Sequence, residues 1–202
     1  MTAATKTPPT DPSSSPLLPR SIVLVGLMGA GKTNIGKQLS EELEVPFVDS
    51  DKVIEDIAGM NIASIFELYG EAKFRSIEAR EIANLMEGPP QIISTGGGAF
   101  VQDDTRRIIR NGGLSVWLKA TPETLASRMS NLDSRPLLKG KDPVQVLTQL
   151  SAQRAPFYQQ AELTVDTDGL SLRSAIDKVK AAILDHLNKG ASPKNKTQEF
   201  SS

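Results

Sequence analysis

Short runs of β-branched and aliphatic residues alternate with longer segments of helical periodicity along most of the chain. Ser21–Val25, SIVLV, predicts a buried strand, and Lys32–Leu43 then repeats aliphatic residues at helical spacing. The same patterns predict further strands at residues 46–48, 91–95, 114–118 and 163–166, and helices at residues 52–58, 62–86 (divided near Gly70), 102–111, from Thr121 and Pro122 onward, 144–158 and 171–187.

Strands that alternate with helices in this way indicate an α/β fold. The connection between two strands is long enough in each case to hold a helix, which is the arrangement that parallel strands need. We therefore expect a three-layer α/β/α architecture with a five-stranded parallel sheet. In such a sheet ligands bind at the carboxyl ends of the strands, so the residues that follow each strand are the first candidates for a site.

Polar sequence at both ends bounds a single predicted domain. Residues 1–20 are rich in Thr, Pro and Ser and residues 190–202 are similarly polar, so neither segment offers enough apolar surface to offset the entropy of ordering it. We predict disordered tails at 1–20 and 190–202 around one folded domain at 21–189. Within it, the polar segment 131–142, interrupted by Gly and Pro, is predicted to be a mobile lid.

Composition excludes several classes of protein. The 202 residues carry a net charge of −1, which provides no field for nucleic acid or an anionic membrane. Apolar runs long enough to cross a bilayer are absent, and the lack of cysteine excludes disulfides. We expect a cytoplasmic monomer whose partners are small molecules. The Ser and Thr content of the N-terminal tail leaves import into a plastid as the weaker alternative.

A phosphate-binding motif follows the first predicted strand. Residues 26–33, GLMGAGKT, match G-x-x-x-x-G-K-[ST] at every fixed position. Glycines here let the backbone point N–H groups at phosphate oxygens, and the next helix adds its positive N-terminus. Lys32 is predicted to reach the β- and γ-phosphates, and Thr33 to ligate Mg²⁺. The flanking strand and helix are the context that the motif requires, which disfavours a plain glycine-rich turn.

Two acidic residues close the second predicted strand. Alternation along a strand would send Asp49 and Asp51 to the same side, at the edge where ligands bind. One could then hold Mg²⁺ through water while the other orients a substrate hydroxyl. Asp and Ser also favour turns and helix N-caps, so residues 49–51 on their own leave a structural role equally open.

The remaining candidates are weaker when each is taken alone. Gly96–Gly98 follow the third predicted strand and suggest close approach of backbone to a ligand. Arg75, Arg135 and Arg154 are each of a type that most often lies on a solvated surface. The charged run at residues 78–81 is expected to be a solvated helix face.

Trp117 and His186 are given structural roles. Trp117 is expected in the core, because the sequence around it contains no aromatic or basic cluster, and His186 is expected to be a surface or packing residue.

The ordered set of motifs resembles one family. GLMGAGKT, the DSD at residues 49–51, GEAKFR, STGGGA, SRPLL and QRAPFY with VDT together resemble the shikimate kinase family of nucleoside-monophosphate-kinase-like P-loop proteins. The resemblance extends over residues 21–187. It implies transfer of the γ-phosphate of ATP to the 3-hydroxyl of shikimate, with Mg²⁺ as cofactor, in the biosynthesis of aromatic amino acids.

The resemblance also implies a role for each matching residue. Those that would wrap the phosphates of ATP are Gly29, Ala30, Gly31, Lys32, Thr33 and Asn34. Asp51 would bind the ring hydroxyls of shikimate, including the attacking one, and Asp49 would contact Mg²⁺ through water. Arg75 and Arg154 would hold the substrate carboxylate, and the backbone of Gly97 would contact the substrate.

The resemblance assigns the lid and the substrate-binding segment too. Arg135 would come from the lid and meet ATP, so that the implied catalytic set is Lys32, Asp51 and Arg135. The segment 61–81 is the candidate substrate-binding flap, and we expect both segments to close on ligands because water competes with the acceptor hydroxyl for the γ-phosphate. Asn34 stands where the family often has Thr, and no residue after Asp166 and Thr167 can be assigned to the adenine base.

Three other functions remain open at this level. Another small-molecule P-loop kinase, such as a gluconate or nucleoside monophosphate kinase, would use the same phosphate loop. A nucleotide-binding protein without catalysis is the alternative from a different class, although Lys32, Thr33, Asp49 and Asp51 are all present. A GTPase is disfavoured, because the chain has no convincing N-K-x-D sequence for guanine.

Overall fold

The computed structural model describes residues 18–129, 137–138 and 140–191, and its centre is a five-stranded parallel sheet. The strands run in the order β2-β3-β1-β4-β5, with bounds β1 Ser21–Val25, β2 Phe47–Asp49, β3 Ile92–Ser94, β4 Gly113–Lys119 and β5 Leu163–Asp166. The helices are α1 Lys32–Leu43, α2 Ser50–Ala58, α3 Ile62–Glu87, α4 Asp103–Gly112, α5 Pro122–Ser127, α6 Pro143–Tyr158 and α7 Leu172–Ala191, with a 3₁₀ turn, η1, at Ala99–Val101.

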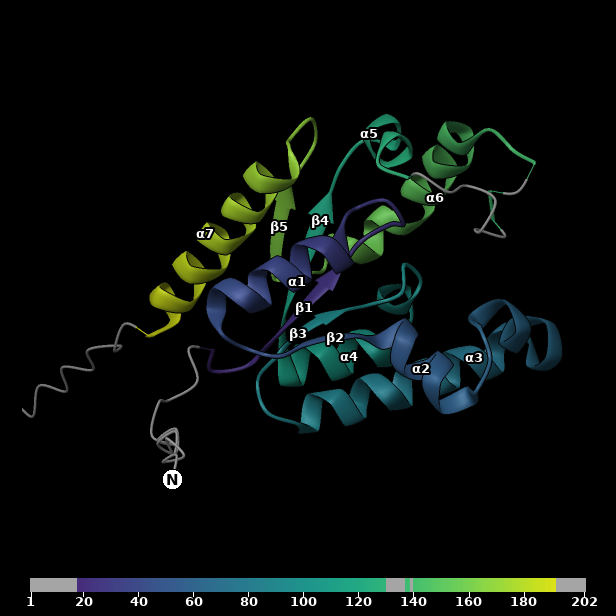
Figure 1. The fold of residues 1–202 in the computed structure, drawn as a ribbon, viewed down its shortest axis with the longest axis horizontal. Helices are drawn as coiled ribbons and strands as arrows, with labels where there is room; N and C mark the ends of the chain where they lie inside the picture. Colours follow the sequence, from purple (N-terminus) through teal and green to yellow (C-terminus); the bar gives the residue numbers. More distant parts are fainter. Residues whose placement is uncertain (1–17, 130–136, 139, 192–202) are drawn as a thin grey trace, which may run out of the picture.

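Helices cover both faces of this sheet. α1 packs against α7 on one face, and α3 packs against α4 on the other (Figure 1). β1 lies at the centre, where Ile22 pairs in register with Ile92 of β3 and with Leu114 of β4. All five residues of β1 are buried, as expected of a strand covered on both sides. The predicted five-stranded α/β/α architecture is confirmed.

A smaller apolar cluster joins α2 to α3 beside the main core. Ile54, Ile65 and Phe74 are buried together there, separately from the aliphatic residues of the sheet. Gly70 interrupts α3 with φ 77° and ψ 168°, a conformation that favours glycine, so that the helix consists of two pieces as its sequence predicts. The outer piece, residues 62–69, belongs to the small cluster.

Several boundaries differ from the sequence prediction. α2 begins at Ser50 rather than at residue 52, and the side chain of Asp49 caps it by accepting the N–H of Asp51 at 3.2 Å. Asp51 therefore lies in the first turn of a helix, and the strand alternation used to place it was wrong. η1 was not predicted.

The predicted N-terminal tail is too long by at least three residues. Leu18 is fully buried in the main core, and Arg20 donates to the carbonyl of Gly113 and forms an ion pair with Glu162. At the other end α7 runs to Ala191, two residues beyond the predicted end of the domain. The rest of both predicted tails lies outside the described residues. No described helix combines the length and the apolar character that a membrane span requires.

Candidate functional site

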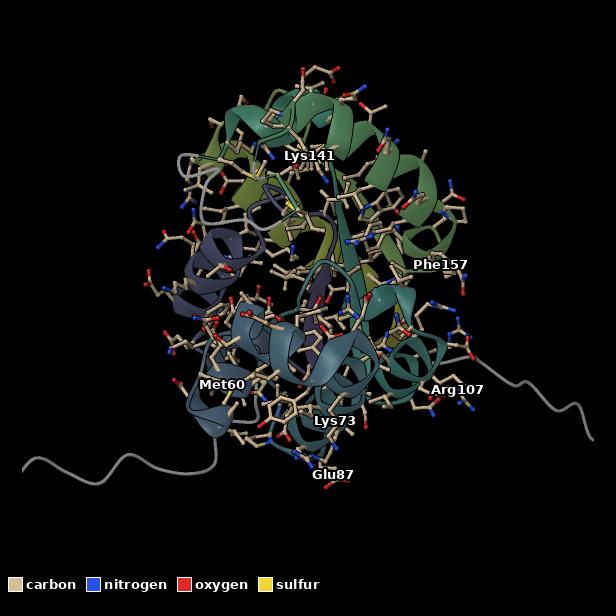
Figure 2. The ribbon with its side chains drawn as sticks, turned by 90° about the vertical axis from the view of Figure 1, so that its right-hand side faces the viewer. Met60, Lys73, Glu87, Arg107, Lys141 and Phe157 are labelled. Carbon is tan, nitrogen blue, oxygen red and sulfur yellow. The ribbon has the colours of Figure 1, made fainter. Side chains whose placement is uncertain are left out.

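A cavity of about 700 Å³ opens at the carboxyl edge of the strands. Residues 29–34, at the end of the phosphate loop and the start of α1, line it together with Asp49 at the end of β2, Asp51 in the first turn of α2, and Gly97 after β3. Figure 2 shows Met60 and Lys73, on the α2–α3 segment, at the opposite side of the view from Lys141, which precedes α6. The lining of the cavity shows that the parallel sheet brings together at one edge motifs that are far apart in the sequence.

The phosphate loop has the backbone of an anion-binding turn. Gly29 and Gly31 have φ values of 81° and 84°, and Gly31 leads directly into α1. A Cβ atom on Gly29 would lie 2.4 Å from the carbonyl oxygen of Leu125, so glycine is required there for space as well as for conformation. Lys32 Nζ donates to the carbonyl oxygens of Gly26 at 2.9 Å and Leu27 at 3.0 Å, which holds its ammonium group beside the loop.

Thr33 connects the phosphate loop to the acidic residue at the end of β2. Its hydroxyl donates to Asp49 Oδ2 at 2.8 Å and lies 3.4 Å from the hydroxyl oxygen of Ser94 on β3. A hydroxyl and a carboxylate at this spacing are oxygen ligands of the kind that Mg²⁺ prefers. The described residues contain no group of three or more His, Cys, Asp or Glu side chains that could hold a metal ion without further ligands. A cation here would need phosphate oxygens or water as well.

Asp51 is the most perturbed carboxylate of the cavity. Burial and the neighbouring charge of Asp49 raise its pKa to about 6, although the positive charge of Lys32 acts in the opposite direction. Asp51 Oδ1 is buried and accepts no hydrogen bond from the described residues. A Cβ atom on Gly96 would lie 2.6 Å from this oxygen, so only glycine leaves room for the carboxylate. A buried, unpartnered acceptor at the cavity wall is suited to a hydroxyl donor from a ligand.

Arg75 lies against the glycine run, on the inner piece of α3. Its guanidinium donates to Oε2 of the buried Glu78 at 2.7 Å and to Oε1 of the exposed Glu71 at 3.1 Å. A Cβ atom on Gly98 would lie 2.7 Å from Arg75 Cζ, which means that the guanidinium rests directly on that backbone. The positive charge of Arg75 acts against the rise in the pKa of Asp51, so the two side chains belong to one electrostatic site.

Arg154 and Tyr158, one turn apart on α6, bind the same carbonyl of the glycine run. Arg154 Nη1 donates to the oxygen of Gly97 at 2.8 Å, and the Tyr158 hydroxyl donates to that oxygen too. Burial raises the pKa of Tyr158 to about 12, so it remains a donor at neutral pH. The two arginines of the sequence prediction thus reach the glycine run from different helices, Arg75 at Gly98 and Arg154 at Gly97.

The sequence interpretation of residues 78–81 was wrong. Glu78 and Glu81 are buried rather than solvated. Burial raises the pKa of Glu78, with Arg75 acting against the rise, and its Oε1 accepts no hydrogen bond from the described residues. A Cβ atom on Gly96 would lie 2.9 Å from that oxygen. The spacing of three residues between Arg75 and Glu78 on a helix was the available signal for this pair.

Arg128, at the end of α5, was also missed. It lines the cavity and donates to the carbonyl oxygens of Thr167 at 2.6 Å and Leu170 at 3.3 Å, in the loop after β5. Leu170 lines the same end of the cavity. The planar guanidinium offers a stacking surface to an aromatic base, and the aliphatic side chain offers it an apolar contact. Its partners lie about forty residues away in sequence, and nothing in the local pattern points to them.

Two predictions lie largely outside the described residues. Arg135 is one of them, and most of the lid at 131–142 is the other. Leu138 is buried, and Asp142 caps α6 by accepting the N–H groups of Val144 and Gln145. The assignment of Arg135 to ATP stays a prediction.

Comparison with known proteins gives consistent matches. The family model described as "Shikimate kinase" matches residues 28–184. The shikimate kinase of Caulobacter vibrioides is 46% identical over 169 residues, which is 84% of each chain. The structure of shikimate kinase from Acinetobacter baumannii in complex with shikimate has a TM-score of 0.78 at 36% identity and covers 83% of this chain and 94% of that one. The family model begins after β1 and covers all the residues that line the cavity, from Met28 to Ala175.

A gluconokinase from Sinorhizobium meliloti shares the fold more distantly. Its TM-score is 0.57 at 17% identity, with 86% of this chain and 98% of that chain covered. Identity this low is informative about the fold alone, so it gives no support to the gluconate alternative that the sequence left open.

Proposed function

This chain belongs to the shikimate kinase family, whose members are ATP-dependent kinases that phosphorylate shikimate, and we propose that the described cavity carries out that reaction on the 3-hydroxyl of shikimate. The observation that carries the proposal is the convergence of four features at one strand edge: the phosphate loop, the buried oxygen of Asp51, and the two arginines on the glycine run. Phosphoryl transfer requires mainly that reactants are positioned and charge is neutralised, and these residues supply both.

The phosphates of ATP would lie along residues 29–34. Backbone N–H groups of the turn and the N-terminus of α1 favour negative charge there. Lys32 would exchange its carbonyl partners, Gly26 and Leu27, for the β- and γ-phosphoryl oxygens. Charge that builds up on the transferred group is stabilised by such preplaced cations, each worth about 3 kcal/mol in favourable cases.

Thr33 and Asp49 fit a divalent cation, which we assign as Mg²⁺. Thr33 would ligate it directly and Asp49 through water, an assignment supported by the 2.8 Å hydrogen bond that already aligns the two side chains. When bound, the cation neutralises charge on the β- and γ-phosphoryl oxygens.

Shikimate is a cyclic carboxylic acid with several hydroxyl groups, and the region where Asp51 and Gly97 line the cavity, with the two arginines beside the glycine run, is suited to it. Arg75 and Arg154 would hold the carboxylate, since guanidinium groups match carboxylate oxygens in pairs. Asp51 Oδ1 would accept the hydrogen bond of the attacking hydroxyl and orient it toward the γ-phosphate. A ligand that lacks this hydroxyl would leave the carboxylate buried and unpaired, which disfavours its binding.

The pH dependence follows from the raised pKa of Asp51, about 6. Because the hydroxyl is oriented by the ionised form, kcat/KM for shikimate should rise about tenfold per pH unit below pH 6 and level off above it. Initial rates between pH 5 and pH 8 at constant ionic strength would measure this. A kcat/KM that stays constant down to pH 5, as a solvated Asp with a pKa near 4 would give, would contradict the role given to Asp51.

Arg128 and Leu170 would bracket the adenine base. Replacing Arg128 with Met removes the planar surface and three hydrogen bonds to the loop after β5, so we expect KM for ATP to rise about tenfold with little change in KM for shikimate. Arg107→Met, on the exposed surface of α4, is the control. If both KM values rose together in the Arg128 variant, a general structural role would replace the base-binding one.

The direct test is ADP release from Mg-ATP in the presence of shikimate, gluconate or nucleoside monophosphates. Turnover with shikimate alone is the expected result. Turnover with gluconate would favour a gluconate kinase. Binding of ATP without acceptor-dependent ADP release would indicate a protein that has lost catalysis.

We further propose that the chain works as a cytoplasmic monomer. Its near-neutral net charge and the absence of cysteine suit a reducing compartment and small-molecule partners. Light scattering of the purified protein at several concentrations would measure the oligomeric state.

A further inference from the structure

A second cavity of about 350 Å³ lies between α6 and strands β4 and β5, and it shares no lining residue with the first. Its walls include the rings of Trp117 and Tyr158 and the aliphatic side chains of Leu27, Leu125 and Ala155. The rings are stacked, with centroids 5.7 Å apart. This volume is at the lower end of the range of about 300–1,000 Å³ that small-molecule sites occupy.

The Trp117 cavity, as we call it, has one charged group and several neutral polar ones. Lys119 Nζ lies 6.0 Å from the centroid of the Trp117 ring, and no carboxylate of the described residues forms an ion pair with it. The nearest acid along the sheet is Asp166, its register partner on β5, whose Oδ1 accepts the N–H of Asp168. Trp117 lies in the main core, as the sequence predicts, and Tyr158 and Lys119, which are distant or unremarkable in sequence, lie against its ring.

The charge and shape of the lining select a class of ligand. An aromatic surface beside a single ammonium group complements a flat ring that carries one negative charge. Ser151, Gln159 and Thr164 line the same cavity and offer neutral hydrogen-bonding groups. The lining includes no Asp or Glu that would repel an anion.

Two walls of the Trp117 cavity are the reverse sides of active-site elements. The Tyr158 hydroxyl donates to the carbonyl of Gly97, which also accepts from Arg154. Leu27 belongs to the phosphate loop, and its carbonyl accepts from Lys32 at 3.0 Å. A ligand that moves either wall therefore changes the position of a group that would bind substrate.

We propose that the Trp117 cavity is a second binding site, for a small aromatic carboxylate, whose ring lies against Trp117 and whose carboxylate pairs with Lys119. Occupancy of this site is linked through Tyr158 to the binding of shikimate at the first cavity. The linkage rests on the proposed function, whereas the binding of the carboxylate does not.

Trp117 is the only tryptophan of the chain, so its fluorescence reports directly on the cavity. Sodium benzoate is the probe, with benzyl alcohol as the uncharged comparison and cyclohexanecarboxylate as the non-aromatic one. We expect benzoate to change the emission with a Kd of about 1 mM or tighter and each comparison compound to bind more weakly. Lys119→Met and Ala155→Leu, which remove the charge and fill the space, should each weaken benzoate binding about tenfold. Lys37→Met, an exposed lysine of α1, should leave it unchanged.

Saturating shikimate separates the two cavities and tests the linkage. Benzoate should still bind in its presence, with a Kd changed at least about threefold, and by reciprocity benzoate should change the Kd of shikimate by the same factor. Tyr158→Phe should keep benzoate binding and remove the change. If the emission did not respond to benzoate, the proposed second site would be wrong. It would also be wrong if shikimate abolished the response while Lys119→Met left it intact, because benzoate would then bind in the first cavity. A Kd that shikimate leaves unchanged would overturn the linkage.

Discussion

Asp51→Asn should lower kcat with shikimate by about a thousandfold and at the same time make the folded protein more stable at neutral pH. The loss of activity follows from the role of the carboxylate, because an amide cannot accept the hydroxyl proton or orient it with a full negative charge. The gain in stability follows from the environment of Asp51, where burial and Asp49 raise the pKa to about 6.

The sign of the stability change can be worked out from that pKa. An Asp in the unfolded chain titrates near pH 3.9, so the native state binds the proton more tightly than the unfolded state does. Stability from this group is fully present below about pH 4 and is lost as the pH rises through 6. At pH 8 the ionised Asp51 costs at most about 3 kcal/mol, and less after solvent screening. Asn does not ionise and avoids this cost.

Thermal unfolding at two pH values provides the internal control. The melting temperature of Asp51→Asn should exceed that of the unmodified chain at pH 8, and the two should approach each other at pH 4. An equal difference at both pH values would mean that the variant acts through packing. Retention of full turnover would remove Asp51 from the mechanism altogether.

Gly98→Ala should weaken shikimate binding about thirtyfold while leaving the fold and the KM for ATP nearly unchanged. The new Cβ would lie 2.7 Å from Arg75 Cζ, so the guanidinium must move away from the glycine run. Displacing one member of a buried charge pair costs about 2 kcal/mol or more, which corresponds to about thirtyfold in affinity. The cost to folding should be smaller than the cost to binding, because the end of the flexible arginine side chain can move while it keeps its contact with the buried Glu78.

Gly88→Ala is the matched control for this variant. A Cβ atom on Gly88 would find its nearest neighbours at 3.6 and 3.8 Å, which are ordinary contacts, and the position lies beyond the end of α3. KM for both substrates and the melting temperature, measured in parallel, separate the two outcomes. If KM for shikimate were unchanged in Gly98→Ala, Arg75 would not anchor the carboxylate. If the variant lost stability as strongly as affinity, the glycine would be required for folding instead.

The sequence predicts those parts of this protein that depend on local pattern. The sheet follows from short buried runs such as Ser21–Val25, and the phosphate loop follows from glycines whose conformation and spacing leave few alternatives. Asp49 and Asp51 were placed at the correct edge for an incorrect reason. They lie there because Asp49 ends β2 and caps α2. The helix-cap role and the position at the ligand-binding edge are therefore compatible rather than alternatives.

The parts that could not be predicted depend on contacts between distant segments. Glu78 looks like a solvated helix charge until the glycine run and Asp51 are packed against it. Arg128 sits in an unremarkable helix end, and its partners come from a loop that only the fold brings near. Periodicity describes which face of a helix is apolar, but not which charges a neighbouring segment will bury.

The break in α3 at Gly70 divides the helix, but side-chain packing still joins its two pieces. Arg75 and Glu78 are on the inner piece, which packs on α4, while the outer piece, residues 62–69, contacts the small cluster with α2. A Cβ atom on Gly70 would meet nothing within 4 Å, so the joint lies in open space. Phe66 of the outer piece packs on Phe74 of the inner piece with ring centroids 4.6 Å apart, and the Arg75 guanidinium lies 5.9 Å from the Phe66 ring. A movement of the outer piece would therefore be felt at the carboxylate anchor, which couples the residence time of shikimate to the recognition of its charge.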